Sequence, residues 1–232
     1  MDESDMSEPA VAQPFLPFLF PLLNEFPTEI RQRLVQNGIE RHVKADTVIC
    51  SEGAKSEHIL FLSSGILSIT ANEDLGKRAF LYGFMPAGSI AGLQMLFNER
   101  VNTYCLTSAV DSHFLLISID DLLQALREYP LAWQACAKEL ATGVKFLLNF
   151  VNLLSHASGY QKLRTFLGWL ERNAQAYPNQ IGLDLSQQEI AARIGLSREM
   201  VNRMLAELRK GGYIEQDERG RFHILKPLPK KF

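Results

Sequence analysis

Polar side chains at residues 198–203 have the types and spacing needed to read the edges of DNA bases. They fall in the first two turns of a helix that Ser197 would cap, and they are Arg198, Glu199, Asn202 and Arg203. Residues four apart share a helix face, so the four side chains form adjacent rows. Arg pairs with guanine O6 and N7, Glu accepts from cytosine N4, and Asn pairs with adenine. A salt-bridged, solvent-facing helix would carry the same residues, so the neighbouring elements decide between the two interpretations.

The flanking sequence predicts a winged helix-turn-helix. The run "LSQQEIAARIG" begins with a capping box, Ser186 and Glu189, and ends at Gly195. A second helix, from Ser197 to about Lys210, follows this glycine-containing turn. The run "YIEQDERGRFHIL" has two apolar stretches around "DERG", which is typical of a β-hairpin and here of a wing. Contacts with phosphates, which set position rather than sequence preference, are expected from Ser186, Gln187, Ser197 and Arg209.

Charge is distributed unevenly along the 232 residues. The chain carries a net charge of −2, which excludes a uniformly basic surface. From residue 159 to the end there are 13 Lys and Arg against 8 Asp and Glu, whereas residues 1–158 hold 11 against 18. A basic C-terminal part on an acidic body indicates that one end of the molecule meets an anion.

Residues 40–118 have the pattern of an antiparallel barrel or sandwich, a rolled-up sheet structure. Short apolar runs alternate with turn residues, as in "TVIC", "HILFLS", "GILSIT", "AFLYGFM", "YCLTSAV" and "HFLLIS". A helix is predicted before them over 27–38. Rolls of this kind often enclose a small-molecule site. The predicted fold class is α+β: a double-stranded β-roll resembling a jelly roll, a long helix and a winged helix-turn-helix.

A heptad pattern follows over residues 120–156. Apolar residues step by four and three along it: Trp133, Ala137, Leu140, Val144, Leu147, Val151 and Leu154. This pattern favours a homodimer in which two such helices pack together, with Leu148 and Phe150 left to face the roll. The alternative is a helix that lies on its own roll. The polar run "SHASG", 155–159, is predicted to be a hinge.

The N-terminus and the cysteines bear on localisation. Residues 1–13 are expected to be loose, and the apolar run "VAQPFLPFLFPLL" is interrupted by Pro14, Pro17 and Pro21 and preceded by acidic residues. It therefore predicts a packed arm rather than a signal peptide or membrane span. The three cysteines, Cys50, Cys105 and Cys136, are scattered, which fits a reducing cytoplasm and argues against a cysteine-bound zinc or iron–sulfur site.

The run "LSQQEIAARIGLSREMVNRMLAELRKGGYIE" closely resembles the winged helix-turn-helix of the CRP/FNR transcription regulators. The resemblance extends over about residues 20–227 and implies an arm (1–19), a β-roll sensor domain (20–120), a dimerisation helix (121–157) and a DNA-binding domain (158–232). It implies that Arg198, Glu199 and Arg203 read a TGTGA-like half-site of a pseudo-palindromic operator. Asn202 departs from the Gly or Ser of the two main subgroups. RNA polymerase is an implied partner, and a membrane is not.

The sensor segment departs from the family's cyclic-AMP-binding pattern. The run "PAGSIAGLQMLF", 86–97, is similar to the phosphate-binding segment, and Gly92 matches its glycine. Leu93 replaces a glutamate, Asn102 and Thr103 replace an Arg–Ser pair, and Leu147 and Leu148 replace Thr–Ser. Phosphate recognition needs a cation or a cluster of donors. The effector is therefore predicted to be something other than cyclic AMP, and its identity stays open.

Other members of the family sense their signal through a bound cofactor, and each cofactor needs particular protein ligands. An iron–sulfur cluster needs four cysteines, and the chain has three. Haem needs an axial ligand, for which His42, His58, His113 and His156 are lone candidates. An apolar ligand, or none, is the remaining alternative. Cysteine oxidation lacks a neighbouring base that would favour the thiolate.

Two other classes of protein compete with a DNA-binding regulator. A metal-dependent jelly-roll enzyme would need clustered histidines and a carboxylate, and residues 40–118 contain no HxH pair, so we expect no enzyme activity. A ligand-binding adaptor would use its C-terminal domain to dock protein in place of DNA. Salt-sensitive, sequence-specific DNA binding distinguishes the regulator from both.

Overall fold

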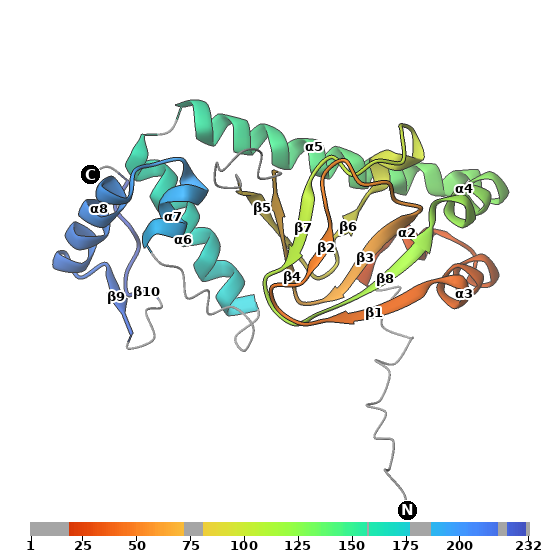
Figure 1. Ribbon diagram of the computed structural model, residues 1–232, viewed down its shortest axis with the longest axis horizontal. Helices are drawn as coiled ribbons and strands as arrows, with labels where there is room; N and C mark the ends of the chain where they lie inside the picture. Colours follow the sequence, from red (N-terminus) through yellow and green to blue (C-terminus); the bar gives the residue numbers. More distant parts are fainter. Residues whose placement is uncertain (1–18, 72–80, 157, 177–186, 218–221, 231–232) are drawn as a thin grey trace, which may run out of the picture.

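The computed structural model describes residues 19–71, 81–156, 158–176, 187–217 and 222–230. A β-roll and a winged-helix domain lie at opposite ends of the molecule, and the long helix α5 (Trp133–His156) runs from one to the other (Figure 1). This arrangement confirms the predicted α+β class. The predictions for residues 1–13, Ser186 and the wing turn at 218–221 lie outside the described residues.

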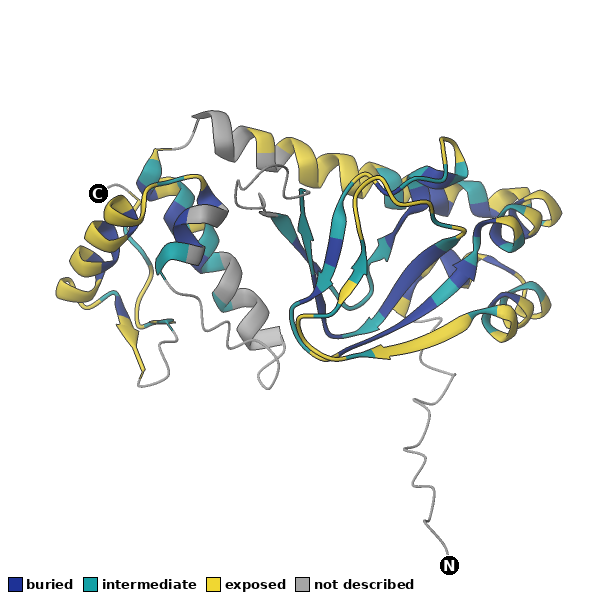
Figure 2. Cartoon of the chain, viewed as in Figure 1, coloured by how far each residue is buried: buried dark blue, intermediate teal, exposed yellow. Residues whose placement is uncertain are grey.

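The roll consists of two four-stranded antiparallel sheets. The first sheet has the order β1 (Ile39–Val43), β8 (Ser112–Ser118), β3 (His58–Ser64) and β6 (Ile90–Ala91). The second has the order β2 (Val48–Cys50), β7 (Cys105–Ser108), β4 (Ile66–Thr70) and β5 (Leu81–Pro86). Strand β1 carries no apolar run that could have revealed it, because its polar residues Glu40, Arg41 and His42 are exposed at the edge of the sheet (Figure 2).

Apolar side chains fill the space between the two sheets. Alternate residues of a strand point to the same face, so each strand contributes every second side chain to this inner core. Its buried members come from both sheets: Leu60, Leu62, Ala91 and Phe114 from the first, and Leu67, Met85 and Leu106 from the second. The roll is therefore held by its own apolar interior.

A second core joins the roll to the helices around it. Helices α2 (Pro21–Glu25), α3 (Thr28–Asn37) and α4 (Ile119–Glu128) pack there with the start of α5. Phe20, Leu22 and Leu23 are fully buried in this core, so the end of the apolar N-terminal run is packed, as its sequence predicts.

The helical stretch predicted between 121 and 157 is two helices rather than one. Helix α4 ends at Glu128, a short 3-10 turn follows at Pro130–Ala132, and α5 begins at Trp133. Proline lacks the amide that a helix interior requires, so the chain changes direction at Pro130. Beyond this break α5 continues for 24 residues along the roll (Figure 1).

The two halves of α5 have different surroundings. Trp133 and Leu140 pack partly against the core that the roll shares with the helices. Farther along, the side chains of Val144, Leu147, Leu148 and Val151 are 51–60% exposed. The expectation that Leu148 faces the roll is therefore wrong, and the side chains of Phe150 and Leu154 lie outside the described residues. Phe146 takes that place, because a Cβ added to Gly83 of β5 would lie 2.6 Å from its ring, so ring and strand are in close contact.

The winged-helix domain has its own core. Helices α6 (Gly159–Ala176), α7 (Gln187–Ile194) and α8 (Arg198–Lys210) enclose it together with the antiparallel hairpin of β9 (Ile214–Gln216) and β10 (Phe222–Ile224). Gly195 joins α7 to α8 with φ of +65°, a conformation that glycine adopts without strain. The predicted helix-turn-helix and wing are thus both present.

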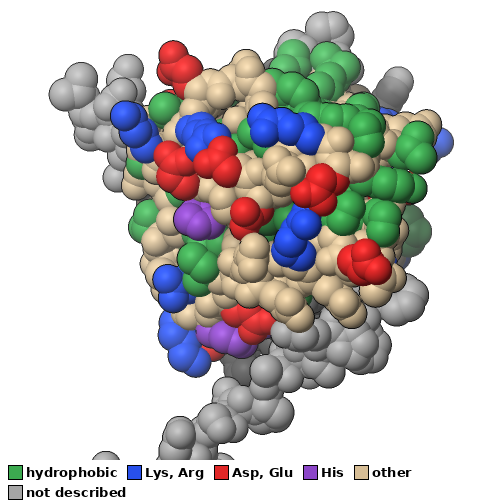
Figure 3. Space-filling model, turned by 90° about the vertical axis from the view of Figure 1, so that its right-hand side faces the viewer, with side chains coloured by type: hydrophobic (Ala, Val, Ile, Leu, Met, Phe, Trp, Pro, Cys, Tyr) green, Lys and Arg blue, Asp and Glu red, His purple; other side chains and the backbone are tan. Residues whose placement is uncertain are grey.

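The opposite end of the molecule differs in character. Figure 3 looks onto the end of the roll, where basic and acidic side chains are interspersed and hydrophobic side chains gather along one edge. None of the helices described is long and apolar enough to cross a membrane.

Candidate nucleic-acid interface

Helix α8 is fixed to the domain by one face and capped at its start. The Ser197 Oγ accepts a hydrogen bond from the Met200 backbone N–H at 3.2 Å, which satisfies one of the free amides of the first turn. The inward face is buried in the domain core through Val201, Met204, Leu205 and Leu208. Cap and core together determine which residues α8 presents to solvent.

The four predicted base readers lie on the outward side of α8. Arg198, Glu199, Asn202 and Arg203 are all exposed, and the helix lies at the end of the molecule remote from the roll (Figures 1 and 2). No part of the described chain covers them, so a major groove could receive this face.

The predicted phosphate contacts lie around the same helix. Ser197 is exposed at its start, and Gln187, half-buried, is the first residue of α7. Arg209 lies in its last turn, where the guanidinium donates to the Gln216 Oε1 of β9 at 3.4 Å. Ser186 lies outside the described residues. These positions are compatible with backbone contacts on either side of a groove, which remain a prediction.

Tyr160 holds the C-terminal segment in place. Its hydroxyl donates to the Pro229 carbonyl at 2.8 Å, and its ring is 7% exposed in the domain core. The two residues are 69 positions apart, and neither has a motif around it, so the sequence carries no signal for this contact.

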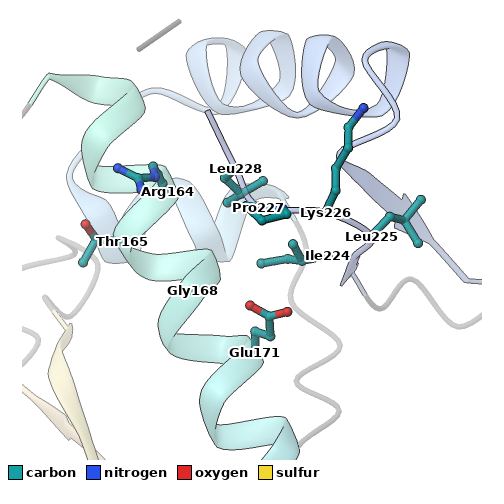
Figure 4. Close-up of a pocket in the computed structure, with 9 residues that line it drawn as sticks. All are labelled: Arg164, Thr165, Gly168, Glu171, Ile224, Leu225, Lys226, Pro227 and Leu228. Atoms are coloured by element: carbon teal, nitrogen blue, oxygen red, sulfur yellow. The ribbon is translucent and has the colours of Figure 1, made fainter. Parts of the chain in front are cut away.

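A cavity of about 630 Å³ lies in the winged-helix domain (Figure 4). It separates α6 from the segment that follows β10, and Glu171 and Ile224 extend towards each other across it. Arg164 and Thr165, also at its edge, point away from the segment. None of the six predicted effector residues lines this cavity.

The predicted effector residues lie in three different environments. Leu93 is 4% exposed and belongs to the core that joins the roll to the helices. Asn102 is also buried, and its amide donates to the Ala54 carbonyl at 3.1 Å, so it holds a turn of the roll. By contrast, Thr103, Leu147 and Leu148 are exposed.

The segment that resembles a phosphate-binding loop, 86–97, is closely packed around Gly92. Gly92 adopts φ of +95°, and a Cβ there would lie 2.5 Å from the Met95 methyl carbon. Tyr104 lies beside Gln94 and the Gly92 backbone, and burial raises the pKa of its hydroxyl. The nearby cation, Arg100, bonds Glu57 at 2.6 Å and Asp120 at 2.5 Å outside the roll. Arg100 is thus already neutralised by two carboxylates.

The candidate haem ligands that the structure describes differ in how accessible their rings are. The rings of His42 and His113 are stacked with centroids 3.8 Å apart, and the two nitrogens of His113 are buried. An iron could approach His113 only if β1 separated from β8. His42 is exposed, His58 is half-buried, and the His156 side chain lies outside the described residues. In the described parts of the chain no group of three or more His, Cys, Asp and Glu could hold a metal ion.

The thiols of Cys50 and Cys136 are poorly suited to redox chemistry. Burial raises the pKa of Cys136 to about 11, and burial is also the main cause that raises the pKa of Cys50. The thiolate is the reactive form of cysteine, so neither side chain is activated for oxidation.

Comparison with known proteins gives the same two-part division. Residues 40–129 match the family described as "Cyclic nucleotide-binding domain", and residues 161–228 match the "Crp-like helix-turn-helix domain". A relative from Bacillus subtilis, "Anaerobic regulatory protein", is 26% identical over 208 residues, which cover 86% of this chain and 85% of the relative.

Two further proteins extend the comparison. The "cAMP-activated global transcriptional regulator Vfr" of Pseudomonas aeruginosa is 22% identical, covering 78% of this chain and 87% of its own. The structure of the regulator CLP of Xanthomonas campestris, described as c-di-GMP responsive, superimposes with a TM-score of 0.71 at 21% identity. That match covers 86% of this chain and all of CLP. With both domains in the family order, this chain belongs to the CRP/FNR family of DNA-binding transcription regulators.

Proposed function

We propose that this regulator binds a pseudo-palindromic, TGTGA-like operator as a homodimer. The observation that carries the proposal is the outward face of α8, where the four polar side chains of 198–203 are exposed above a buried apolar face. In a dimer the two α8 helices would enter successive major grooves, about one helical turn or 34 Å apart.

Each base reader has a distinct chemical task in this proposal. Arg198 and Arg203 offer paired donors to guanine, and Glu199 offers an acceptor to cytosine N4. Asn202 can pair with adenine, which makes it the residue that sets the outer bases of the half-site. Residues 186, 187, 197 and 209 hold the register by binding phosphates.

The second half of α5 supports the homodimer. Val144, Leu147 and Val151 are spaced by three and four residues, and each is more than half exposed. An apolar stripe of this kind is stable in water when a second helix covers it. A second copy supplies an identical stripe, so a two-fold pairing buries both.

Regulation is proposed to pass through the hinge between α5 and α6. A signal in the roll would alter the pairing of the α5 helices, and reorientation near Ser158 would then change the spacing of the α8 helices. The predicted setting is the cytoplasm, where the dimer would meet DNA and RNA polymerase.

Fluorescence anisotropy tests the DNA-binding proposal. A labelled duplex with two TGTGA-like half-sites is titrated against a scrambled duplex of the same length, at several salt concentrations. We expect the operator to bind at least about 1,000-fold more tightly than the scrambled duplex, and both affinities to fall steeply with salt. Equal affinity for the two duplexes would contradict sequence reading.

The effector is proposed to be something other than cyclic AMP. Leu93 is buried in an apolar core, Asn102 holds a turn, and Arg100 is engaged by two carboxylates, so the described roll offers no free cation to a phosphate at these positions. Calorimetry with cyclic AMP should therefore give no binding heat.

A cyclic-nucleotide-responsive protein with an atypical pocket is the second candidate. The match of residues 40–129 to the cyclic nucleotide-binding family favours it, as do the descriptions of Vfr and CLP. Micromolar binding of cyclic AMP, cyclic GMP or cyclic di-GMP in the same calorimetry would support this candidate in place of the first.

A further inference from the structure

The first turn of α6 is rigidly capped where the chain leaves the hinge. The Ser158 backbone N–H donates to the Gln161 Oε1 at 2.8 Å, and the Gln161 N–H donates to the Ser158 Oγ at 3.3 Å. This reciprocal pair is a capping box, which fixes the direction of the helix from its first residue. Movement of the hinge is therefore passed directly to the residue that follows, Gly159.

Gly159 touches the start of the recognition helix. A Cβ built on it would lie 3.0 Å from the Met200 Sδ and 3.4 Å from the Leu196 Cδ1. The first of these distances is shorter than an ordinary carbon–sulfur contact, so the Met200 sulfur sits against the bare backbone of α6. The absence of a side chain at 159 is what permits this approach.

Met200 belongs to the turn that carries the base readers. It follows Glu199 directly, and its N–H is the donor to the Ser197 cap. Pressure on the Met200 side chain would therefore act on the capped turn to which Arg198 and Glu199 are attached. These two side chains must meet base edges within hydrogen-bonding distance, so a displacement of a few tenths of an ångström changes their fit.

Helix α6 has little freedom to move away from Met200. Tyr160, next to Gly159, is tied to the Pro229 carbonyl, and Leu163 is fully buried one turn later. Both side chains pack in the same core as the inward face of α8. An added methyl group at 159 would thus be accommodated at the start of α8 instead.

We propose that Gly159 is a positioning residue for DNA reading: its bare backbone sets where the first turn of α8 sits relative to the hinge. This inference rests on the proposed function, since it concerns how the same four side chains are aimed. It gives the hinge a direct contact with the recognition helix.

The test compares Gly159→Ala, Met200→Ala and the double variant. We expect Gly159→Ala to weaken operator binding by about three- to tenfold, in the lower part of the range that couplings between touching residues give. Binding to a scrambled duplex should not change, because non-specific binding depends on phosphate contacts. The melting temperature should stay level or rise, since alanine favours a helix more than glycine does.

Met200→Ala removes the sulfur that the new methyl would meet. In the Met200→Ala background, Gly159→Ala should therefore have no further effect on operator affinity. Thr165→Ala is the matched control, because Thr165 is an exposed residue of the same helix α6. It should leave operator affinity unchanged.

Three results decide the proposal. If Gly159→Ala binds the operator like wild type, or weakens operator and scrambled duplexes equally, Gly159 does not position α8. If its effect persists in the Met200→Ala background, the contact invoked here is not responsible. If wild type itself fails to prefer the operator, the proposed function fails instead, and the two failures are thereby distinguished.

Discussion

At the scale of single residues, Arg203 is expected to contact a base and Arg209 a phosphate. Arg203 faces outward from the second turn of α8, whereas Arg209 lies in its last turn beside Gln216. Arg203→Ala should weaken operator binding by about 1–3 kcal/mol and relax preference at one base pair.

Arg209→Ala is the matched comparison, and anisotropy on operator and scrambled duplexes measures both variants. Loss of a phosphate contact should weaken the two duplexes to the same extent and lower the salt slope by about 1. If Arg203→Ala also weakened both duplexes equally, base reading by Arg203 would be excluded.

Because His113 is buried in the roll, we expect the stability of the roll to depend on pH. Burial and the stacked His42 lower the pKa of His113, although Glu40 opposes them. From about pH 6.5, the ordinary value, down to this lower pKa, the unfolded chain binds a proton that the folded chain does not. The free energy of unfolding should therefore fall as the pH falls through that window.

Thermal denaturation between pH 8 and pH 5 measures this effect. His113→Phe keeps a flat ring but cannot be protonated, so its melting temperature should fall less on acidification than that of wild type. Gln36→Ala, at an exposed position on α3 that carries no titratable group, is the control and should retain the wild-type pH dependence. Parallel curves for wild type and His113→Phe would show that His113 is not responsible.

Structural features that depend on neighbouring residues in the sequence can be predicted from it. Features that depend on tertiary packing cannot. Ser197 is recognisable as a cap because its partner, Met200, is three residues away. The burial of Leu93 depends on helices that precede and follow the roll in the sequence, and the sequence alone shows only that Leu93 is apolar. The same holds for the stacking of His42 on His113 across two strands 71 residues apart.

At the scale of elements, Gly65 should control the stability of the β3–β4 connection. It has φ of +88°, and a Cβ there would overlap the Ser112 Oγ and lie 2.7 Å from the Asp111 carbonyl. Gly65→Ala should therefore lower stability by about 2 kcal/mol or more, from backbone strain and steric overlap together.

Gly53→Ala measures the backbone strain without the steric overlap, because Gly53 has φ of +78° and nothing lies within 4 Å of the added Cβ. Its cost should be about 1 kcal/mol. Thermal denaturation of both variants makes the comparison, and equal losses would mean that the contact with β8 contributes nothing.

The exposed half of α5 should determine the oligomeric state. Val144→Asp places a charge in the middle of the apolar stripe, and burying an unpaired charge is costly. The variant should run as a 26.2 kDa monomer in light scattering, and wild type at twice that mass. Val48→Asp, at a 62% exposed position on β2, is the control and should remain dimeric. If Val144→Asp remained dimeric, α5 would be excluded as the dimer interface.

The periodicity of α5 revealed its extent but not what each part contacts. The steps of three and four continue through Trp133 and Leu140, yet both pack partly on the roll. A heptad pattern records which residues share a face and does not say what covers it. The packing of Trp133 and Leu140 places the first half of α5 on its own roll, and Phe146, in the second half, touches Gly83 of β5.

At the scale of the whole molecule, charge and geometry point to the same end. The sequence after residue 158 is basic and the rest is acidic. The structure places the outward face of α8 at the end remote from the roll (Figure 1). An anionic duplex is therefore attracted to the end that carries the base readers, and the acidic body stays away from it.

The most direct test of the account varies the spacing of two half-sites. Anisotropy compares wild type on duplexes whose TGTGA-like half-site centres lie one helical turn apart with duplexes in which one half-site is moved by about five base pairs. A homodimer that reads both half-sites through α8 should bind the first tightly and the second about as weakly as a duplex with one half-site. Equal affinity for the two spacings would contradict a dimer that reads a pseudo-palindrome.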